Sequence, residues 1–405
     1  MYSLFTDKRI LVGITGSIAV YKMCDWVRSL MKEGAHVTVV MTESATRFVS
    51  PLTFAALSGN RVHVNMFDPA VEKDIPHINL ARRNELILVA PATAATISRM
   101  SSGLADDLLS TIVLATTSPV VVCPAMNSNM YLHPATQANL NTLQGYGYTV
   151  VNPDSGAMAC GEEGPGRLPE WDSVLDSCAE VLSSQDLSGK SILITAGPTE
   201  EPLDPVRFLS NRSSGKMGYA LARVARRRGA KVTLVAGPTH LPNPSGIECV
   251  HIRDAQAMYD EVVNRFDDAD IIVKAAAVSD FRPAHTMAEK IKKQGSDLYL
   301  ELTRNKDILL ELGQRNKKAG NPKILVGFAA ESENLREEGK RKLQEKNLDC
   351  IVVNDISAAD AGFAVDTNRV TMIDRKGEVK DFPLLSKDDT AERIWDEVIS
   401  LSEKS

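Results

Sequence analysis

Two segments of the chain share one pattern: a run of apolar residues, a turn that contains glycine, and then apolar positions at helical spacing. The first run ends at Gly16 and Ser17; the second ends at Gly197 and continues, after an insertion, into the segment 210–218. A strand that ends in small residues and leads into a helix offers an anion free backbone N–H groups and the positive end of the helix dipole. The pattern therefore predicts two phosphate-binding sites, one in each half of the chain.

The first half alternates apolar runs of strand length with helical patterns, which is typical of a parallel sheet covered by helices on both faces. We predict strands at residues 10–15, 36–41, 86–90, 120–123 and 148–152, with helices at 19–32 and 108–115 among the connections. Small and hydroxylated residues follow four of these strands, in segments 15–17, 42–44, 91–96 and 124–127. Ligands of such folds bind beyond the carboxyl ends of the strands, so this arrangement favours a binding site over four unrelated turns.

The second half starts a new pattern of the same kind after a polar stretch of small residues at 183–189, which we interpret as a linker. Its predicted strands are 191–195, 231–235, 271–275, 324–328 and 350–354, and its most regular helix is 217–228. The pattern fits an interrupted Rossmann-like sheet. We therefore expect an α/β protein with two Rossmann-like domains, residues 1–188 and 189–405.

Length and composition agree with this organisation. At 405 residues the chain exceeds the length at which a single core keeps growing. It has no signal-peptide pattern and no apolar run of the roughly 18 residues that a membrane span needs. Its net charge of −6 argues against nucleic acid as the main partner. We expect a cytoplasmic protein that binds neither nucleic acid nor a membrane.

The six cysteines are dispersed, without a Cys-x-x-Cys pair or the spacing of a metal site, and we interpret them as free thiols. Cys160 differs from the others because it lies in the glycine-rich segment 155–167, where neither a strand nor a helix is expected.

Two enzyme classes fit the sequence poorly. Lys216 follows Ser213-Ser214-Gly215, but the spacing of a Walker phosphate loop is absent. A nicotinamide-linked oxidoreductase would explain two Rossmann-like openings, yet neither half has G-x-G-x-x-G followed by an acidic residue at the expected distance.

Several motifs of the first half resemble the flavin-dependent cysteine decarboxylases, and within that group the phosphopantothenoylcysteine decarboxylases. These motifs are Gly16-Ser17-Ile18-Ala19, His77-Ile78-Asn79-Leu80, Pro91-Ala92-Thr93-Ala94, Asp106-Asp107-Leu108-Leu109-Ser110-Thr111, Pro124-Ala125-Met126-Asn127 and the Cys160 loop. The resemblance implies a flavodoxin-like domain that binds FMN through Gly16, Ser17, Thr42, Ser44, Thr93 and Ser110. Two positions depart from the family, because Ala95 and Tyr131 stand where many members have asparagine and tryptophan.

The same resemblance implies three catalytic residues. Cys160 would supply the proton that completes the reaction, and Asn127 would recognise the substrate carboxylate. His77 would be the base of the oxidation step. From the residues alone, a histidine that follows Pro76 is as compatible with a structural or capping role as with catalysis.

The second half resembles the phosphopantothenate–cysteine ligases. The motifs are Gly197-Pro198-Thr199, Asp204-Pro205-Val206-Arg207, the segment 210–218, Ala275-Ala276-Ala277-Val278-Ser279-Asp280, Glu289-Lys290-Ile291-Lys292-Lys293 and Gly327-Phe328-Ala329-Ala330-Glu331. The resemblance implies that Asn211 and Arg207 hold an acyl-nucleotide and that Lys290 acts in the second half-reaction. The implied nucleotide-binding residues are Ala275, Ala276, Asp280, Lys290, Asn305, Lys306, Asp307, Ile308, Phe328, Lys342 and Lys346, with Asp280 also a candidate metal ligand.

The two halves follow each other as in the bifunctional enzymes of coenzyme A biosynthesis. This resemblance implies 4′-phosphopantothenate, L-cysteine and CTP as substrates, with Mg²⁺ as a cofactor beside FMN. It also implies a homo-oligomer, a dodecamer built from trimers of flavin domains and dimers of ligase domains. The alternative is a non-catalytic flavoprotein regulator, which would not need Cys160 and would lack the ligase half.

Overall fold

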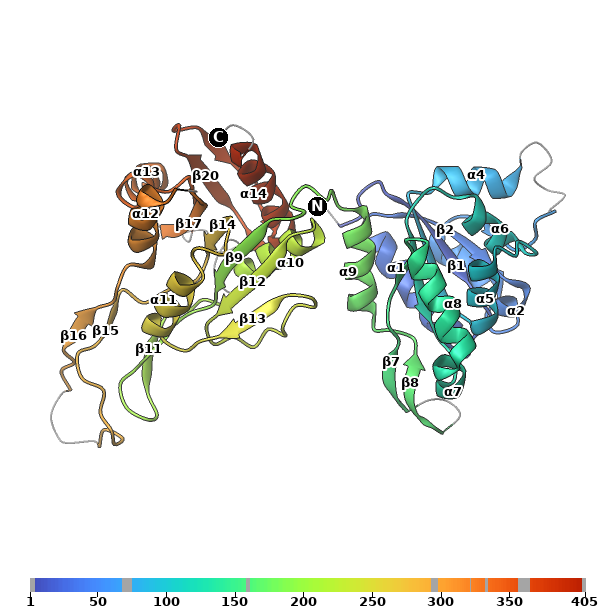
Figure 1. The fold of residues 1–405 in the computed structure, drawn as a ribbon, viewed down its shortest axis with the longest axis horizontal. Coiled ribbons are helices and arrows are strands. Elements are labelled where there is room, and N and C mark those ends of the chain that lie inside the picture. The colour runs from blue at the N-terminus through green and yellow to red at the C-terminus, as the bar shows by residue number, and fades with distance from the viewer. Residues whose placement is uncertain are drawn as a thin grey trace. The chain divides into compact units, whose positions relative to one another are not determined.

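The computed structural model describes residues 4–67, 75–157, 161–292, 298–320, 322–331, 334–355 and 365–402. It contains two α/β units, which divide the chain between Ser183 and Ser184 (Figure 1). Cys160 lies outside the described residues. Within the described part of the chain, every helix is too short or too polar to cross a bilayer.

The first unit is built on a parallel sheet with the strand order β3-β2-β1-β4-β5-β6. Its strands are β1 (Arg9–Ile14), β2 (His36–Met41), β3 (Val62–His63), β4 (Leu86–Ala92), β5 (Val120–Pro124) and β6 (Thr149–Val150). All residues of β4 and β5 are buried, because helices cover both faces of the sheet. The direction of strand addition reverses between β1 and β4, and doubly wound sheets bind their ligands at such a switch point.

Helices cover the sheet of the first unit on both faces. They are η1 (Ile18–Lys22), α1 (Met23–Lys32), α2 (Glu43–Thr46), α3 (Pro51–Ser58), α4 (Pro76–Arg83), α5 (Ala94–Ser102), α6 (Leu108–Ala115), α7 (Ser128–Leu132), α8 (Pro134–Gly145) and α9 (Trp171–Leu182). Apolar residues of α1, α3 and α9 form the core on one face, where the rings of Trp26 and Trp171 lie 5.2 Å apart. Residues of α4, α5, α6 and α8 form the core on the other face. An antiparallel hairpin, β7 (Asp154–Ala157) and β8 (Glu163–Arg167), precedes α9.

The second unit repeats this strand order in a larger sheet, β13-β12-β9-β14-β17-β18-β20-β21. Its strands are β9 (Ser191–Ala196), β12 (Lys231–Ala236), β13 (Glu248–His251), β14 (Ile271–Lys274), β17 (Ile324–Glu331), β18 (Cys350–Asp355), β20 (Val370–Asp374) and β21 (Val379–Asp381). The strands from β13 to β18 are parallel, and β20 and β21 add an antiparallel edge. The switch point lies between β9 and β14.

The sheet of the second unit also has a core on each face. Its helices are α10 (Lys216–Arg227), α11 (Ala255–Asn264), α12 (Ile308–Lys318), α13 (Leu335–Glu345) and α14 (Lys387–Ser402). α10 and α14 pack on one face, where the indole N–H of Trp395 donates to the carbonyl of Leu221 (3.0 Å). α11, α12 and α13 pack on the other.

Three antiparallel ribbons complete the second unit. They pair β10 (Glu200–Pro202) with β11 (Phe208–Ser210), β15 (Phe281–Pro283) with β16 (Leu302–Arg304), and β19 (Thr367–Asn368) with β22 (Leu385–Ser386). In Figure 1, β15 and β16 extend away from the sheet.

The prediction of two Rossmann-like α/β domains is confirmed, and each predicted strand is present. The largest differences are at β17, which continues three residues beyond the predicted 324–328, and at β6, which contains only two of the five residues predicted at 148–152. The helix predicted at 19–32 is a 3-10 turn, η1, followed by α1. Strands β3 and β13, the antiparallel edge β20–β21 and the ribbons were not predicted. The expectation that segment 155–167 holds no strand is wrong, because β7 and β8 pair there as a hairpin in which Gly156, Gly164 and Gly166 adopt positive φ values that other residues rarely adopt.

The last residues of the segment 183–189, which was predicted as a linker, pack against the second unit. The Leu187 side chain is buried in that unit's core, and its backbone N–H donates to the carbonyl of Arg228 (3.0 Å). The buried guanidinium of Arg228 pairs with the carboxylate of Asp186 (2.6 Å) as well as with Asp396 (2.8 Å). The predicted boundary between residues 188 and 189 falls just after this packed segment.

This packing predicts that a fragment 184–405 is more stable than a fragment 189–405. The shorter fragment loses the burial of Leu187, worth about 2 kcal/mol, and one of the carboxylates around Arg228. Thermal unfolding of the two fragments measures the difference, and we expect a clearly lower midpoint for 189–405. Equal midpoints would mean that Asp186 and Leu187 contribute nothing to the second unit.

Candidate active sites

In the first unit, one threonine joins the two strands that flank the switch point. The hydroxyl of Thr15, which follows β1, donates to the carbonyl of Pro91 (2.6 Å), and the backbone N–H of Thr93 donates to the same hydroxyl oxygen (3.0 Å). Thr15 is 1% exposed. These bonds hold the ends of β1 and β4 together, and with them the two loops that leave the sheet there.

The next residue, Gly16, allows a close approach between loops. A Cβ atom at this position would lie 2.5 Å from the Cβ of Ser44, closer than real side chains approach. Thr42, at the end of β2, caps the short helix α2 that contains Ser44. The structure thus brings together three of the residues predicted to bind a cofactor, from the ends of β1 and β2.

A cavity of about 480 Å³, here called the N-terminal cavity, opens beside the switch point. The carboxyl-terminal ends of β1, β4 and β5 contribute most of its lining, and the hairpin β7–β8 contributes the rest. The predicted residues that line it are Gly16, Ser17, Thr93 and Asn127. Sequence reasoning did not single out the basic residue Arg167, which also lines it.

Hydroxyl groups cap the helices that start at this cavity. The hydroxyl oxygens of Ser17 and Thr93 accept backbone N–H bonds at the starts of η1 and α5, each at 3.4 Å. A capping hydroxyl accepts through its oxygen and keeps its own proton for donation. Ser110 is different, because it forms a capping box with Asp107 at the start of α6 and is absent from the cavity lining. Its predicted role in cofactor binding stays a prediction.

Asn127 carries the amide that the sequence predicts to recognise a carboxylate, and it already contacts one. Its side-chain N–H₂ donates to the carboxylate of Glu162 (2.5 Å), next to β8 in the hairpin, while its oxygen caps α7 by accepting from the N–H of Asn129 (2.8 Å). The Glu162 carboxylate accepts the hydrogen bond that Asn127 would donate to a substrate carboxylate. For the predicted binding, the substrate carboxylate must displace that of Glu162.

His77 does not line the N-terminal cavity. It is the second residue of α4, and among the described residues its buried Nδ1 has no hydrogen-bond partner. Buried nitrogen atoms normally have partners, so a capping role satisfied within α4 does not account for this residue.

The second unit uses the same device at its switch point. The hydroxyl oxygen of Thr195, in β9, accepts the backbone N–H of Ala276, just beyond β14 (3.1 Å). Gly215 then starts α10 with a φ of 77°, in the left-handed region where glycine is favoured. The end of β14 and the positive end of α10 therefore face the same space.

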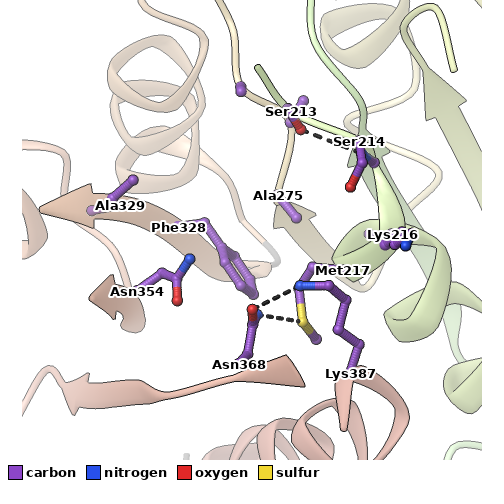
Figure 2. A pocket seen from close by; sticks show the side chains of 15 residues that line it. Ser213, Ser214, Lys216, Met217, Ala275, Phe328, Ala329, Asn354, Asn368 and Lys387 are labelled. Atoms are coloured by element: carbon purple, nitrogen blue, oxygen red, sulfur yellow. Dashed lines mark hydrogen bonds between the residues drawn. The ribbon is translucent and has the colours of Figure 1, made fainter. Parts of the chain in front are cut away.

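That space is a smaller cavity of about 120 Å³, here called the C-terminal cavity (Figure 2). Ala275, Ala276 and Phe328, all predicted to bind the nucleotide, line it together with the loop 213–218. Three polar residues that sequence reasoning missed also line it: Asn354, Asn368 and Lys387.

Several of the other predicted nucleotide-binding residues lie near the start of α12: Asn305, Lys306, Asp307, Ile308 and Lys346. The carboxylate of Asp307 caps α12 and pairs with Lys346 (2.9 Å). Lys274, at the end of β14, is close enough to both groups to be affected by their charges. Burial, followed by the charge of Lys346, lowers the pKa of Lys274 to about 8, although Asp307 and Asp280 act in the opposite direction.

Further predicted residues here serve the local structure. The side chain of Asn305 donates to the carbonyl of Ser279 (2.8 Å), and Lys306 lies over the ring of Tyr259. Ile308 is buried in the core, so only its backbone is available to a ligand. Lys342 lies on α13, four residues before Lys346.

Asp204 organises the segment that carries the remaining predicted catalytic residues. Its carboxylate accepts the backbone N–H of Arg207 (2.8 Å) and of Ile291 (3.1 Å), the residue after Lys290. Burial alone would raise the pKa of Asp204, but the backbone N–H bonds from Val206, Ile291 and Arg207 outweigh it and hold the pKa below its usual value. The guanidinium of Arg207 donates to the carbonyl of Ile291 (3.1 Å), which also holds the two segments together.

Asn211 is tied to the end of β14, since its side-chain N–H₂ donates to the carbonyl of Ala277 (3.0 Å). Asp280 is exposed nearby. Within the described ranges, no group of three or more His, Cys, Asp or Glu side chains could hold a metal ion. One carboxylate is nevertheless a usual protein contribution to Mg²⁺, which takes further oxygens from phosphates and water.

Two family models match the chain. Residues 3–183 match the model described as Flavoprotein, and residues 187–401 match the DNA/pantothenate metabolism flavoprotein C-terminal domain.

The chain is also similar to full-length curated proteins. It is 44% identical to the coenzyme A biosynthesis bifunctional protein CoaBC of Bacillus subtilis over 99% of both chains. It is 44% identical to the protein of the same name from Escherichia coli K12 over 97% of both. Among solved structures, the C-terminal domain of a coenzyme A biosynthesis bifunctional protein CoaBC is 41% identical and covers 55% of this chain and 100% of its own, with a TM-score of 0.47.

Proposed function

The chain belongs to the family of coenzyme A biosynthesis bifunctional proteins, and we propose that it uses its two sites for two consecutive reactions. The second unit ligates L-cysteine to 4′-phosphopantothenate. The first unit then decarboxylates the product, 4′-phosphopantothenoylcysteine, to 4′-phosphopantetheine. The domains proposed for these reactions are residues 1–188 for the decarboxylase and 189–405 for the ligase.

One observation carries this proposal: each unit has its own switch point and its own cavity. Each also has a buried threonine whose hydroxyl joins the two strand ends at the switch point, here called the threonine clamp. Thr15 and the N-terminal cavity belong to the first unit, and Thr195 and the C-terminal cavity belong to the second. A protein with one activity needs only one of them. The family matches cover both units, which supports a separate reaction in each.

The first unit is a flavoprotein domain, and we propose FMN as its flavin. The N-terminal cavity, at about 480 Å³, is within the range of small-molecule and cofactor sites. The close approach at Gly16 and the helix starts capped by Ser17 and Thr93 suit a phosphate group. When bound, FMN would take up two electrons as the substrate thiol becomes a thioaldehyde, whose C=S group is the electron sink for loss of carbon dioxide, and would return them to the ene-thiolate that remains.

The protein's own residues hold the substrate and move its protons. The amide of Asn127 would hold the carboxylate that is lost, taking the place that Glu162 has in the structure. Cys160, which lies between β7 and β8 in the sequence, would donate the proton that completes the product. A loop can deliver that proton after the substrate has bound while it keeps water out.

His77 supports the proposal that the protein is a homo-oligomer. A catalytic base must reach the reacting group, but His77 is absent from the lining of the N-terminal cavity of its own chain. A cavity completed at a contact between subunits of the proposed trimer of flavin domains would resolve this. The proposed dodecamer combines such trimers with dimers of ligase domains.

The second unit would activate the carboxylate of 4′-phosphopantothenate with CTP and Mg²⁺. Nucleotidyl transfer gives an acyl-cytidylate and pyrophosphate, so the site must hold many negative charges. Positive groups lie near the end of β14: the start of α10 and the side chains of Lys274 and Lys346. The exposed carboxylate of Asp280 would serve as a ligand of Mg²⁺.

Asn211, Arg207 and Lys290 would act on the acyl-cytidylate. Asn211 is fixed beside Ala277, where it can hold the acyl carbonyl. The carboxylate of Asp204 accepts backbone N–H bonds from Arg207 and from Ile291, the residue after Lys290. These bonds hold Arg207 and the Lys290 segment close to each other. Lys290 would serve the step in which the amine of cysteine displaces the nucleotide.

The two alternative functions are less well supported. A non-catalytic flavoprotein regulator has no use for the second unit, whose family model spans 187–401. A nicotinamide-linked oxidoreductase is disfavoured because neither unit contains the dinucleotide-binding fingerprint G-x-G-x-x-G followed by an acidic residue. The expected cytoplasmic location stays a prediction.

Coupled turnover of the purified full-length protein tests the proposed function. With 4′-phosphopantothenate, L-cysteine, CTP and Mg²⁺, we expect 4′-phosphopantetheine, pyrophosphate and carbon dioxide, all followed by mass spectrometry and gas analysis. Omission of CTP should stop all three products. A preparation that retains flavin but forms none of them would favour the non-catalytic regulator.

The geometry at Gly16 predicts the effect of a single methyl group on flavin binding. In Gly16→Ala the new Cβ meets Ser44, so the two loops must separate, and we expect about 10-fold or greater loss of FMN affinity, as overpacking of about 1–3 kcal/mol implies. Gly145→Ala is the matched control, because nothing lies within 4 Å of its Cβ. Visible absorbance after gel filtration and fluorescence titration measure the retained FMN. Equal retention in both variants would remove the close approach at Gly16 from the flavin site.

A further inference from the structure

The C-terminal cavity ends at a polar cluster that the reactions described above leave without a role. Figure 2 shows the side chains of Asn354, Asn368 and Lys387 around the ring of Phe328. They come from β18, β19 and the start of α14. The loop 213–218 and the start of α10 line the same cavity. Segments far apart in the sequence thus converge on one small space.

Lys387 brings a buried positive charge to this cluster. Its residue is 7% exposed, and its ammonium group donates to the side-chain oxygen of Asn368 (2.7 Å) and more weakly to the carbonyl of Thr367 (3.4 Å). No carboxylate of the described residues lies within ion-pair distance of it, since the nearby Asp366 pairs with Lys216 instead (2.6 Å). Buried charges are normally paired with an opposite charge.

The charge of Lys387 is unfavourable in the absence of a ligand. Burial, followed by repulsion from Lys216, lowers the pKa of Lys387 to about 8, against the attraction of Asp366. Lys216 is the first residue of α10, so the positive end of that helix adds to the same potential. An anion in the cavity would compensate all three groups.

Asn354 gives independent evidence for a missing partner. It is 9% exposed, it lines the cavity, and its side-chain oxygen has no hydrogen-bond partner among the described residues. The oxygen and nitrogen of an asparagine amide are exchangeable by rotation, so this side chain can either donate to a phosphate or accept from a ligand N–H or O–H group. An unsatisfied buried polar atom that faces a cavity indicates a ligand group there.

We propose that Lys387, Asn354 and Asn368, with the start of α10, form a subsite that holds one phosphate group of a ligase substrate. The inference rests on the proposed function of the second unit. The cavity of about 120 Å³ is well below the roughly 300 Å³ at which small-molecule pockets begin, so it takes one group of a ligand whose remainder lies outside. Both substrates carry such a group: 4′-phosphopantothenate ends in a phosphate monoester, and CTP ends in a γ-phosphate.

Calorimetric titration of the full-length protein with four ligands tests the subsite. The ligands form two pairs that differ only in the phosphate in question, 4′-phosphopantothenate with pantothenate, and CTP with CDP. The test variant is Lys387→Met, which keeps the length of the side chain and removes the charge. Lys380→Met is the matched control, because Lys380 lies on β21 and pairs with Glu397 (2.6 Å) away from the cavity.

We expect Lys387→Met to weaken binding of one phosphate-bearing ligand by about 10- to 100-fold, the usual effect of losing a charged hydrogen bond. The partner ligand that lacks this phosphate should bind as it does to the wild type. A loss confined to 4′-phosphopantothenate identifies the monoester as the occupant, and a loss confined to CTP identifies the γ-phosphate. Lys380→Met should bind all four ligands as the wild type does.

Two results would overturn the subsite: unchanged affinity of Lys387→Met for every ligand, or an equal loss for all four. If Lys387→Met does not fold, Asn354→Asp decides by the same titrations, because a carboxylate beside the phosphate should weaken the same ligand selectively. A wild-type protein that binds neither CTP nor 4′-phosphopantothenate would instead contradict the proposed function itself.

Discussion

Each of the two sites depends on a threonine hydroxyl that joins two neighbouring parallel strands where the loops beyond them diverge. At a switch point the chain leaves neighbouring strands in opposite directions, so the loops beyond them would separate without a cross-connection. Thr15 bonds to both Pro91 and Thr93 across β1 and β4, and Thr195 accepts the N–H of Ala276 across β9 and β14. Both threonines are fully or almost fully buried, where an unmade hydrogen bond is costly. The cavities open beside these two clamps.

The two units place different chemistry around the same framework. Apolar side chains such as Ile18, Met126 and Met130 make up most of the N-terminal cavity, and the capping hydroxyls of Ser17 and Thr93 add polar groups, which suits a flavin ring with one phosphate. The second unit has buried or half-buried lysines at the end of β14 and at the start of α14. Their charge suits ligands with many phosphates that bind and leave. The shared fold therefore does not imply a shared reaction.

Much of the fold could be predicted because its central strands are continuous apolar runs bounded by glycine and hydroxylated residues. The strands β9 and β12 begin at the predicted residues for this reason. In the antiparallel edge, β20 is a short run of five residues that mixes buried apolar and partly buried polar positions, and β21 has only three residues, so periodicity does not distinguish either from loop. Some residues that line the two cavities could be predicted because they form compact motifs, as at 16–17 and 275–276. Lys387 and Asn354 were missed because each is a single polar residue, and only the tertiary fold brings them together.

Some predicted residues acquire a different local explanation from the structure. Ser110 completes a capping box, and Ile308 is a core residue, although each stands in a motif that the family resemblance connects with ligand binding. A motif conveys which residues occur together but not which of them faces the ligand. His77 illustrates the same limit, because one chain does not bring it to the cavity that its proposed role requires.

Replacing each threonine clamp in turn measures whether the two switch points organise two separate sites. Thr15→Val and Thr195→Val each remove a hydroxyl and leave a buried N–H unpaired, at a cost of about 1–3 kcal/mol. In the full-length protein, Thr15→Val should weaken FMN binding and decarboxylation while CTP-dependent release of pyrophosphate continues at the wild-type rate. Thr195→Val should slow pyrophosphate release and leave FMN binding and decarboxylation of added phosphopantothenoylcysteine unchanged. Loss of both activities in either variant, or of neither in both, would contradict the account.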